Sequence, residues 1–308
     1  LHLRRVDVTD VQLAPVGLRL LTASTSELGL ASTAAAASSM VERLAWVRKP
    51  RSGTQTPAEV DACLATWRQA VGRGDEAAFR RRLAAEAWQL DDVVAALRAT
   101  AWPADLPLPS WAAVLEDVLA HPHEAADPPT GQPIAFAEIL MPFLLVARRR
   151  LRDRVGDGVD QLFAPSAFDA VERLLLLRLS DVAGRTLFSE FTGFRASAST
   201  SWDRLVLAAS DSDVTTTYDA FAGSVREGGL GEIFRHYPVL ARLTSRLTEL
   251  WIASTAELVD RLRRDHEELA RLFNRGMALG RVAGAEPGLS DPHHGGRMVT
   301  TLTFECGE

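Results

Sequence analysis

Residues 238–273 read PVLARLTSRLTELWIASTAELVDRLRRDHEELARLF, and this stretch decides the fold of the chain. Leucine recurs in it at steps dominated by three and four residues, which is the spacing of one face of an α-helix. The positions of this face are Leu240, Leu243, Leu247, Leu250, Ser254, Leu258, Leu262, Leu269 and Leu272. Pro238 in the first turn and Gly276 beyond the last turn are the residues expected at the two ends of a helix. We therefore predict one helix over 238–273, about 50 Å long at 1.5 Å per residue.

Helical patterns also dominate the first half of the chain. The predicted helices start at Pro57, Asp75 and Asp91, run from Trp111 to Ala120 behind Ser110 as N-cap, and run from Ala135 to about Val155. The side chains predicted to point inward include Val60, Leu64, Trp67, Val71, Phe79, Leu83, Leu144, Ala147 and Leu151. Pro142 lacks a backbone donor, so it lies in the first turn of its helix or kinks that helix.

Strand patterns are confined to the C-terminal part, at 279–283 and 299–306. In the second segment apolar and polar residues alternate over a short distance, as they do in a half-buried strand. The predicted fold class is therefore mainly α, a large helical domain that carries a β-hairpin at its C-terminal end.

A loop with paired glycines, Gly288-Leu-Ser-Asp-Pro-His-His-Gly-Gly-Arg297, joins the two predicted strands. Gly295 and Gly296 allow positive φ and a close approach of backbone N–H groups to an anion, and Arg297 adds a fixed positive charge. We therefore predict phosphate contacts for Gly295, Gly296 and Arg297. The alternative interpretation is an ordinary hairpin turn with Arg297 exposed to solvent.

The composition excludes several classes of protein. The chain has 308 residues, is 47% hydrophobic and 24% charged, and carries a net charge of −6, so we expect no nucleic-acid partner. Its longest apolar runs, 139–147 and 174–177, are far shorter than the ~18 residues of a membrane span, so we expect none. Cys63 and Cys306 form neither a disulfide framework nor a thiolate zinc site, which favours a cytoplasmic location.

Residues 1–39 differ from the rest of the chain. They are rich in Ala, Ser, Thr and Leu, show no sustained period, and lack the pattern of a signal peptide. We predict that they are disordered or an artefact of an upstream start, that Met40 is a reasonable start, and that their removal leaves the fold intact. The expected organisation is thus 1–39, a helical domain over 40–276, and a strand-bearing part over 277–308.

The loop carries a resemblance to a known family. Ser290-Asp-Pro-His293 followed by Gly295-Gly-Arg297 and a strand resembles the loop that precedes the Lys-Pro-Arg strand of class II (LanM-type) lanthipeptide synthetases. Further segments stand in the order of that family: Phe136–Leu144 with Arg148–Arg152, Glu172–Ser180 with Thr186–Phe191, and Tyr237–Leu243 with Trp251 and Glu257–Asp265. The resemblance runs from about residue 40 to the end, and four motifs in the right order make it fairly specific.

This resemblance implies a dehydratase related to lipid kinases, with 277–308 as the first hairpin of the kinase-like N-lobe. Such enzymes use ATP and Mg²⁺ to phosphorylate Ser and Thr of a precursor peptide, leader plus core, and then eliminate the phosphate. Zinc belongs to a separate cyclase domain, of which this chain contains nothing. The resemblance makes Asp291 and His293 catalytic residues of the loop, and it places a small amide more often than a histidine at the position of His294.

Arginines supply almost all of the positive charge. Arg148, Arg149 and Arg152 belong to a cluster that is a solvated helix face, a set of partners for carboxylates, or a docking surface for an acidic leader peptide. The histidine pairs at 121/123 and 293/294 give too few ligands for zinc, so no metal site is predicted.

The only lysine of the chain, Lys49, lies in a Lys-Pro-Arg tripeptide far upstream of the loop, and we interpret that tripeptide as a coincidence. Because phosphoryl transfer in this fold needs a lysine on the phosphates, we expect residues 1–308 to bind ATP weakly or not at all and to leave a precursor peptide unmodified. The alternative function is a free-standing helical module that binds a peptide or protein without catalysis.

Overall fold

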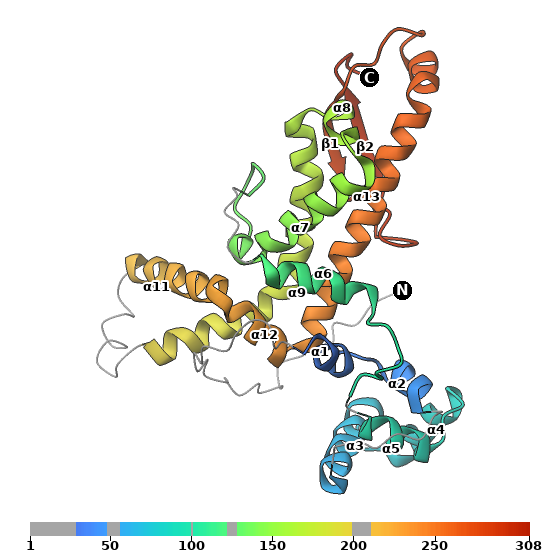
Figure 1. Ribbon diagram of the computed structural model, residues 1–308, viewed down its shortest axis with the longest axis vertical. Helices are drawn as coiled ribbons and strands as arrows, with labels where there is room; N and C mark the ends of the chain where they lie inside the picture. The colour runs from blue at the N-terminus through green and yellow to red at the C-terminus, as the bar shows by residue number, and fades with distance from the viewer. Residues whose placement is uncertain (1–28, 48–55, 100, 122–127, 199–210) are drawn as a thin grey trace.

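The computed structural model describes residues 29–47, 56–99, 101–121, 128–198 and 211–308 (Figure 1). Its body is built around α13 (Pro238–Phe273), which packs against α6 (Ser110–Ala120), α7 (Ala137–Val155) and α9 (Pro165–Ala198). One large hydrophobic cluster joins these helices. The predicted fold class, mainly helical with a β-hairpin at the C-terminal end, is confirmed.

Helix α13 has the bounds that the sequence predicts. Pro238 lies in its first turn, and beyond its last turn the N–H of Gly276 donates to the carbonyl of Ala270 over 2.9 Å. Gly276 has a φ of 80°, a left-handed conformation that costs glycine little and that often ends a helix. The local signals at the two ends therefore suffice to place this helix.

The buried face of α13 is not the predicted leucine stripe. Leu243 and Leu272 are exposed, and most other leucines of the stripe are only half-buried. The buried positions are Leu240, Ala241, Thr244, Ser245, Thr248, Trp251, Ile252, Thr255, Ala256, Val259, Leu262 and Ala270. The hydroxyls of Thr244 and Thr248 donate to carbonyls one turn earlier in the helix, so these buried polar groups are satisfied within α13.

A second, smaller core lies at the end of the molecule opposite the hairpin (Figure 1). It is formed by α3 (Pro57–Gly72), α4 (Glu76–Ala85) and α5 (Leu90–Arg98), which pack around Leu64, Phe79, Leu83 and Val93. Thr56 and Glu59 form a capping box at the start of α3, and Asp75 caps α4 through the N–H of Ala77. Val71, predicted to point inward, is exposed.

Residues 29–39 belong to the folded body. Helix α1 (Leu30–Ala36) packs against α13 and buries Thr33, Ala34 and Ala35, and α2 (Met40–Val47) follows it. The prediction of disorder over 1–39 is therefore wrong for 29–39. Residues 1–28 and the Lys49 tripeptide lie outside the described residues. A short alanine-rich segment carries little periodicity of its own, and this helix is stabilised by its packing.

The C-terminal hairpin consists of β1 (Val282–Pro287) and β2 (Thr300–Phe304), which pair antiparallel. Val282 pairs with Phe304 and Pro287 with Thr300, and the register is irregular just after Val282. The carbonyl of Val282 accepts from the N–H of Ala164 over 2.8 Å, at the start of α9, against which β1 packs. This contact places β1 three residues later than the strand predicted over 279–283, whereas β2 lies within the predicted 299–306.

The other helices differ from the predictions mainly at their ends. Ser110 is the first residue of α6, and Pro109 is its N-cap. Pro142 lies inside α7, beyond the first turn, while Leu144, Ala147 and Leu151 are buried as predicted. The remaining elements are α8 (Gly158–Leu162), α11 (Asp211–Ser224), the π-helical turn η2 (Val225–Gly229) and α12 (Leu230–His236).

Candidate functional site

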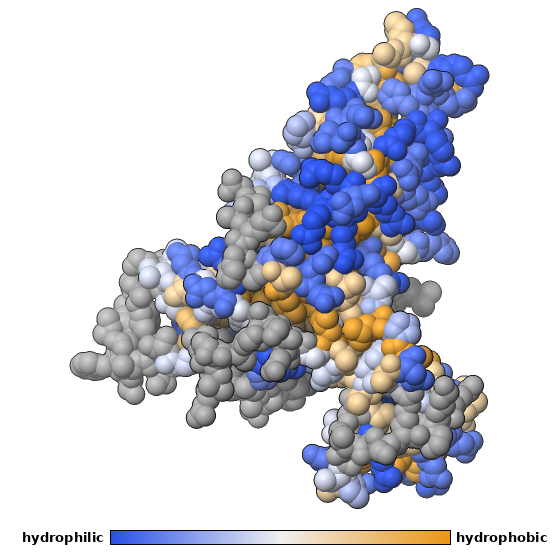
Figure 2. Space-filling model, viewed as in Figure 1, coloured by the Kyte–Doolittle hydropathy of each residue, from blue (hydrophilic) through white to orange (hydrophobic). Residues whose placement is uncertain are grey.

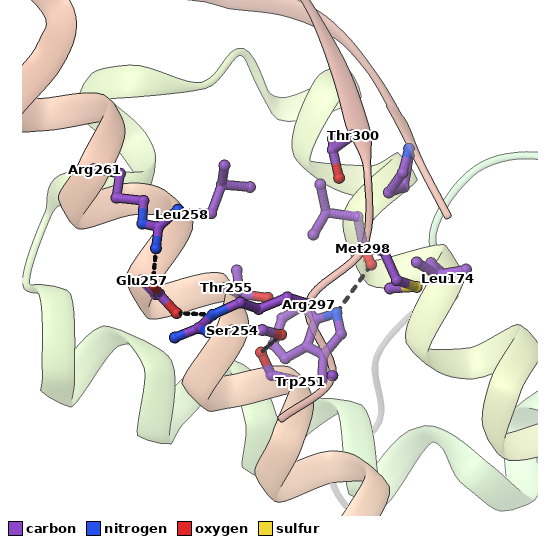
Figure 3. A pocket seen from close by; sticks show the side chains of 13 residues that line it. Leu174, Trp251, Ser254, Thr255, Glu257, Leu258, Arg261, Arg297, Met298 and Thr300 are labelled. Atoms are coloured by element: carbon purple, nitrogen blue, oxygen red, sulfur yellow. Dashed lines mark hydrogen bonds and ion pairs between the residues drawn. The ribbon is translucent and has the colours of Figure 1, made fainter. Parts of the chain in front are cut away.

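The loop between β1 and β2, residues 288–299, folds back onto α13 and forms the rim of a cleft (Figure 3). This cleft, called the inner cleft below, has a volume of about 190 Å³ and lies between the loop, α13 and α9. Its lining residues are Val171, Leu174, Trp251, Ser254, Thr255, Glu257, Leu258, Arg261, Pro287, Gly296, Arg297, Met298 and Thr300. The inner cleft therefore has a mainly apolar wall and a charged edge.

Two backbone hydrogen bonds close the loop into a tight turn. The N–H of His293 donates to the carbonyl of Arg297 over 2.8 Å, and the N–H of Arg297 donates to the carbonyl of His293 over 2.9 Å. The three residues between them, His294, Gly295 and Gly296, have φ values of 37°, 90° and 94°. Because most side chains are strained at positive φ, the paired glycines are what permits this turn.

Gly296 also allows the loop to approach α13. A Cβ atom at this position would lie 3.2 Å from the Cβ of Leu250, whereas a Cβ at Gly295 would meet nothing within 4 Å. Gly295 is therefore needed for backbone conformation alone, and Gly296 for conformation and close packing.

Two backbone N–H groups of the turn are not free to bind a phosphate in this conformation. The N–H groups of Gly296 and Arg297 both donate to the carbonyl of His293, over 3.1 and 2.9 Å. Their hydrogen-bonding capacity is occupied inside the turn. The guanidinium of Arg297 is the charged group of this loop that lines the inner cleft.

A carboxylate from α13 binds this guanidinium. The Nε of Arg297 lies 2.6 Å from Oε2 of Glu257, and the other oxygen of Glu257, Oε1, accepts from Arg261 one turn later on α13 (Figure 3). The hydrogen bond from Arg297 lowers the pKa of Glu257 below its usual range, and the charge of Arg261 adds to this effect. Glu257 is therefore ionised near neutral pH and lies between two arginines.

The predicted catalytic residues lie apart from this arrangement. Asp291 and His293 are exposed and do not line the inner cleft. The hydroxyl of Ser290 donates to the carbonyl of Asp291 and accepts from the N–H of Val299, each over 3.1 Å, which ties the start of the loop to its end. The structure thus brings Gly296 and Arg297 to the cleft and leaves Asp291, His293 and Gly295 on the solvent side of the turn.

Two of the three arginines predicted to bind peptide are engaged in ion pairs. Arg148 forms two hydrogen bonds, of 2.8 and 2.6 Å, with the buried carboxylate of Glu172 on α9. The hydrogen bonds from Arg148 to Glu172 raise the pKa of Arg148, and they outweigh burial, which acts in the opposite direction. Arg149 pairs with Asp117 on α6 at 3.3 Å. The structure therefore supports the carboxylate-partner interpretation for Arg148 and Arg149.

Arg152 is exposed on the same helix and lines a different cleft of about 520 Å³ between α7, α8 and α9. In this cleft Arg152 lies with the Arg148–Glu172 pair and Asp169. Trp251 and Phe143 are buried, and the indole N–H of Trp251 donates to the carbonyl of Val171 over 3.1 Å.

Sequence reasoning missed Glu257 and Arg261 as part of the site. They are separated from Arg297 by 40 and 36 residues, so only the folded loop brings the three together. The available signal was the i, i+4 spacing of Glu257 and Arg261, which also occurs on ordinary exposed helix faces.

The described residues contain neither a cluster of metal ligands nor a helix that could span a membrane. No group of three or more His, Cys, Asp or Glu side chains is arranged to hold a metal ion in the part of the chain that the structure describes. Within the same residues, no helix has the length and apolar character required to cross a membrane.

One comparison with protein families matches the C-terminal part of the chain, which supplies most residues of the inner cleft. No curated protein matches the sequence. Residues 237–308, which comprise α13, the hairpin and the loop, match the model of a domain of unknown function, DUF4135.

Proposed function

We propose that this chain provides the helical domain and the phosphate-site loop of a class II (LanM-type) lanthipeptide synthetase. Such an enzyme dehydrates Ser and Thr of a precursor peptide by phosphorylation and elimination of phosphate. The match of residues 237–308 to DUF4135, a domain that occurs in lanthipeptide synthetase-type proteins, supports the proposal. The observation that carries it is the Gly-Gly turn, which sets Arg297 on the edge of the inner cleft opposite Arg261.

The residues at the inner cleft fit a phosphate group by charge. Arg261 and Arg297 are fixed cations with planar donor groups, which suit the oxygens of a phosphate. ATP, with Mg²⁺, would donate the phosphoryl group when bound. The described residues bring no set of carboxylates together for Mg²⁺, so we assign no residue of this chain to the metal.

We assign different steps to the residues of the loop. Arg297 neutralises the charge on the transferred phosphate, because a cation at the cleft edge stabilises charge that develops in the transition state. His293 and Asp291, both exposed on the solvent side of the turn, are the residues that we assign to proton transfer to or from the substrate. The partner is the precursor peptide, and we place the protein in the reducing cytoplasm, where Cys63 and Cys306 remain unpaired.

We further propose that residues 1–308 do not modify a peptide on their own. The sequence has a single lysine, Lys49, so no lysine is available from α13, the hairpin or the loop. Arg297, the one cation of the loop, is shared with Glu257. Both features weaken the neutralisation of phosphate on which this chemistry depends.

The test uses the complete gene product that contains residues 1–308, incubated with its precursor peptide, ATP and Mg²⁺. His293→Ala should lower the rate of dehydration by about 100-fold or more, since general acid–base groups contribute on the order of 10²–10⁴ to a rate. Asp291→Ala should also impair dehydration, and peptide binding should stay within about two-fold for both variants. Mass spectrometry of the peptide reports phosphorylated and dehydrated products separately.

The matched control is His294→Asn, a change in the same turn to a residue that tolerates positive φ. It should leave dehydration close to wild type. Normal dehydration by both the Asp291 and the His293 variants would remove these residues from the active site. Peptide binding without any phosphorylated or dehydrated product from the complete protein would favour the alternative, a helical binding module without catalysis.

A further inference from the structure

Glu257 lies where an anionic ligand of Arg261 and Arg297 would lie. Its two carboxylate oxygens accept from different arginines, Oε2 from Arg297 at 2.6 Å and Oε1 from Arg261. Arg261 comes from α13 and Arg297 from the loop, so the two guanidinium groups face one oxyanion from two elements (Figure 3). A carboxylate held in this way has the hydrogen-bonding pattern of a bound phosphate.

These ion pairs are weak enough for a ligand to replace them. The side chain of Arg297 is 53% exposed and that of Glu257 is 30% exposed. Ion pairs with this exposure contribute little stability, because water and salt screen them. A dianionic phosphate carries more charge than one carboxylate and has more acceptor oxygens, so it competes well for two arginines.

The space around Glu257 also fits a larger anion. Glu257 and Arg261 line the inner cleft and, on their other side, a second cleft of about 820 Å³, called the outer cleft. The outer cleft has four arginines, Arg154, Arg261, Arg263 and Arg264, against two carboxylates, Glu257 and Asp260. Among the described residues, neither Arg154 nor Arg264 forms an ion pair. Figure 2 shows that hydrophilic residues cover this half of α13.

The two clefts differ in volume, so each fits a different part of the ligand. The inner cleft, at about 190 Å³, is smaller than the roughly 300–1,000 Å³ of pockets that enclose a whole small molecule. It therefore takes a group of the size of a phosphate, and the outer cleft has room for what is attached to that phosphate.

We propose that Arg261 and Arg297 form a two-arginine site for the phosphate of a phosphate monoester or nucleotide, and that Glu257 competes with this phosphate for both guanidinium groups. The identity of the ligand rests on the proposed function, because a peptide phosphoester and the terminal phosphate of ATP are the two sources in that reaction. The arrangement makes Glu257 an internal inhibitor of the site, and it makes Arg261 a binding residue outside the glycine-rich loop.

The experiment titrates residues 1–308 with inorganic phosphate, ATP and a phosphoserine peptide, and follows the arginine Nε–H signals by NMR. Glu257→Gln should bind inorganic phosphate about five-fold or more tightly than wild type, since it removes the competing charge. In the Glu257→Gln background, Arg261→Gln and Arg297→Gln should each weaken binding about ten-fold. The source whose affinity exceeds that of inorganic phosphate identifies the natural ligand.

Glu249→Gln is the matched control, because Glu249 pairs with Arg246 on the same helix at 2.5 Å and does not line either cleft. It should leave the affinity within about two-fold of wild type.

Unchanged phosphate affinity in Glu257→Gln, or no effect of Arg261→Gln in that background, would overturn the proposal. Equal affinities for all three probes would contradict the placement of the rest of the ligand in the outer cleft. These titrations involve no dehydration, so they fail or succeed independently of the Asp291 and His293 variants.

Discussion

Gly295 and Gly296 have nearly the same backbone conformation and different surroundings. Their φ values are 90° and 94°, but only Gly296 packs against another element, at Leu250 of α13. The pair therefore separates two effects of a glycine, the relief of backbone strain and the space for close packing. Both effects act on the same short turn, which positions Arg297.

An added side chain should cost less stability at Gly295 than at Gly296. Gly295→Ala should destabilise the turn by about 1–2 kcal/mol, the cost of a side chain at positive φ. Gly296→Ala should cost at least about 1 kcal/mol more, because its Cβ would crowd Leu250 at 3.2 Å. Hydrogen exchange of residues 288–299 measures the opening of the turn. Equal protection in the two variants would show that the loop does not pack on α13 in solution.

Helices α7 and α9 are joined by a charged contact inside an otherwise apolar interface. Glu172 on α9 is 5% exposed, and Arg148 on α7 binds both of its oxygens. The buried carboxylate makes Arg148 necessary to the interface, because an unpaired buried charge is costly. The neighbouring pair of Arg149 with Asp117 is more exposed, at 39% and 33% for the two side chains.

Arg148→Gln should lower the free energy of unfolding by about 2–4 kcal/mol, somewhat less than for a fully buried pair because the side chain of Arg148 is 30% exposed. Arg149→Gln should cost less than about 1 kcal/mol, as expected for an exposed pair. Urea denaturation at neutral pH measures both variants. If Arg148→Gln instead kept full stability and lost peptide binding, the docking-surface interpretation of Arg148 would be correct.

A charged contact joins the N-terminal helix α2 to α13, beside the packing of α1 on α13. Glu42 at the start of α2 accepts two hydrogen bonds from Arg242 of α13, of 2.6 and 2.9 Å, and Arg242 also donates to the carbonyl of Ala37. Burial by itself would raise the pKa of Glu42. Hydrogen bonds from Arg242 and Ser39 together outweigh burial and lower this pKa from 4.5 to about 2. This contact ties α2, which packs against α5 of the small core, to the N-terminal end of α13 (Figure 1).

The corresponding prediction concerns stability and pH. The pKa of Glu42 is lower in the folded chain than its ordinary value of 4.5, so its contribution is complete above about pH 4.5 and is lost as the pH falls toward 2. Glu42 is 43% exposed, and solvent screening limits the cost of Glu42→Gln at pH 7 to about 1 kcal/mol. The difference in the free energy of unfolding between wild type and variant, measured by denaturation from pH 7 to pH 3, should shrink with acidification.

Glu268→Gln, in an exposed pair with Arg271, is the control and should show a smaller difference at pH 7. A difference that stayed constant or grew in acid would mean that the pair does not form.

The sequence by itself determined the elements whose signals are local. The bounds of α13 follow from Pro238, Gly276 and the helical spacing between them, and the existence of the hairpin and its glycine turn follows from short patterns near residues 282–304. Tertiary structure decided everything that depends on contacts distant in sequence. It buried a mixed face of α13 that contains alanines, threonines and Trp251 in place of the leucine stripe, began β1 at the residue that bonds Ala164, and packed residues 30–36 on α13. It also placed Glu257 against Arg297. These residues are 40 positions apart, and the periodicity of the sequence does not predict their contact. The physical reason is that helix ends and turns are set by dihedral angles and hydrogen bonds within a few residues, whereas burial and ion pairing depend on which surfaces the folded chain brings together.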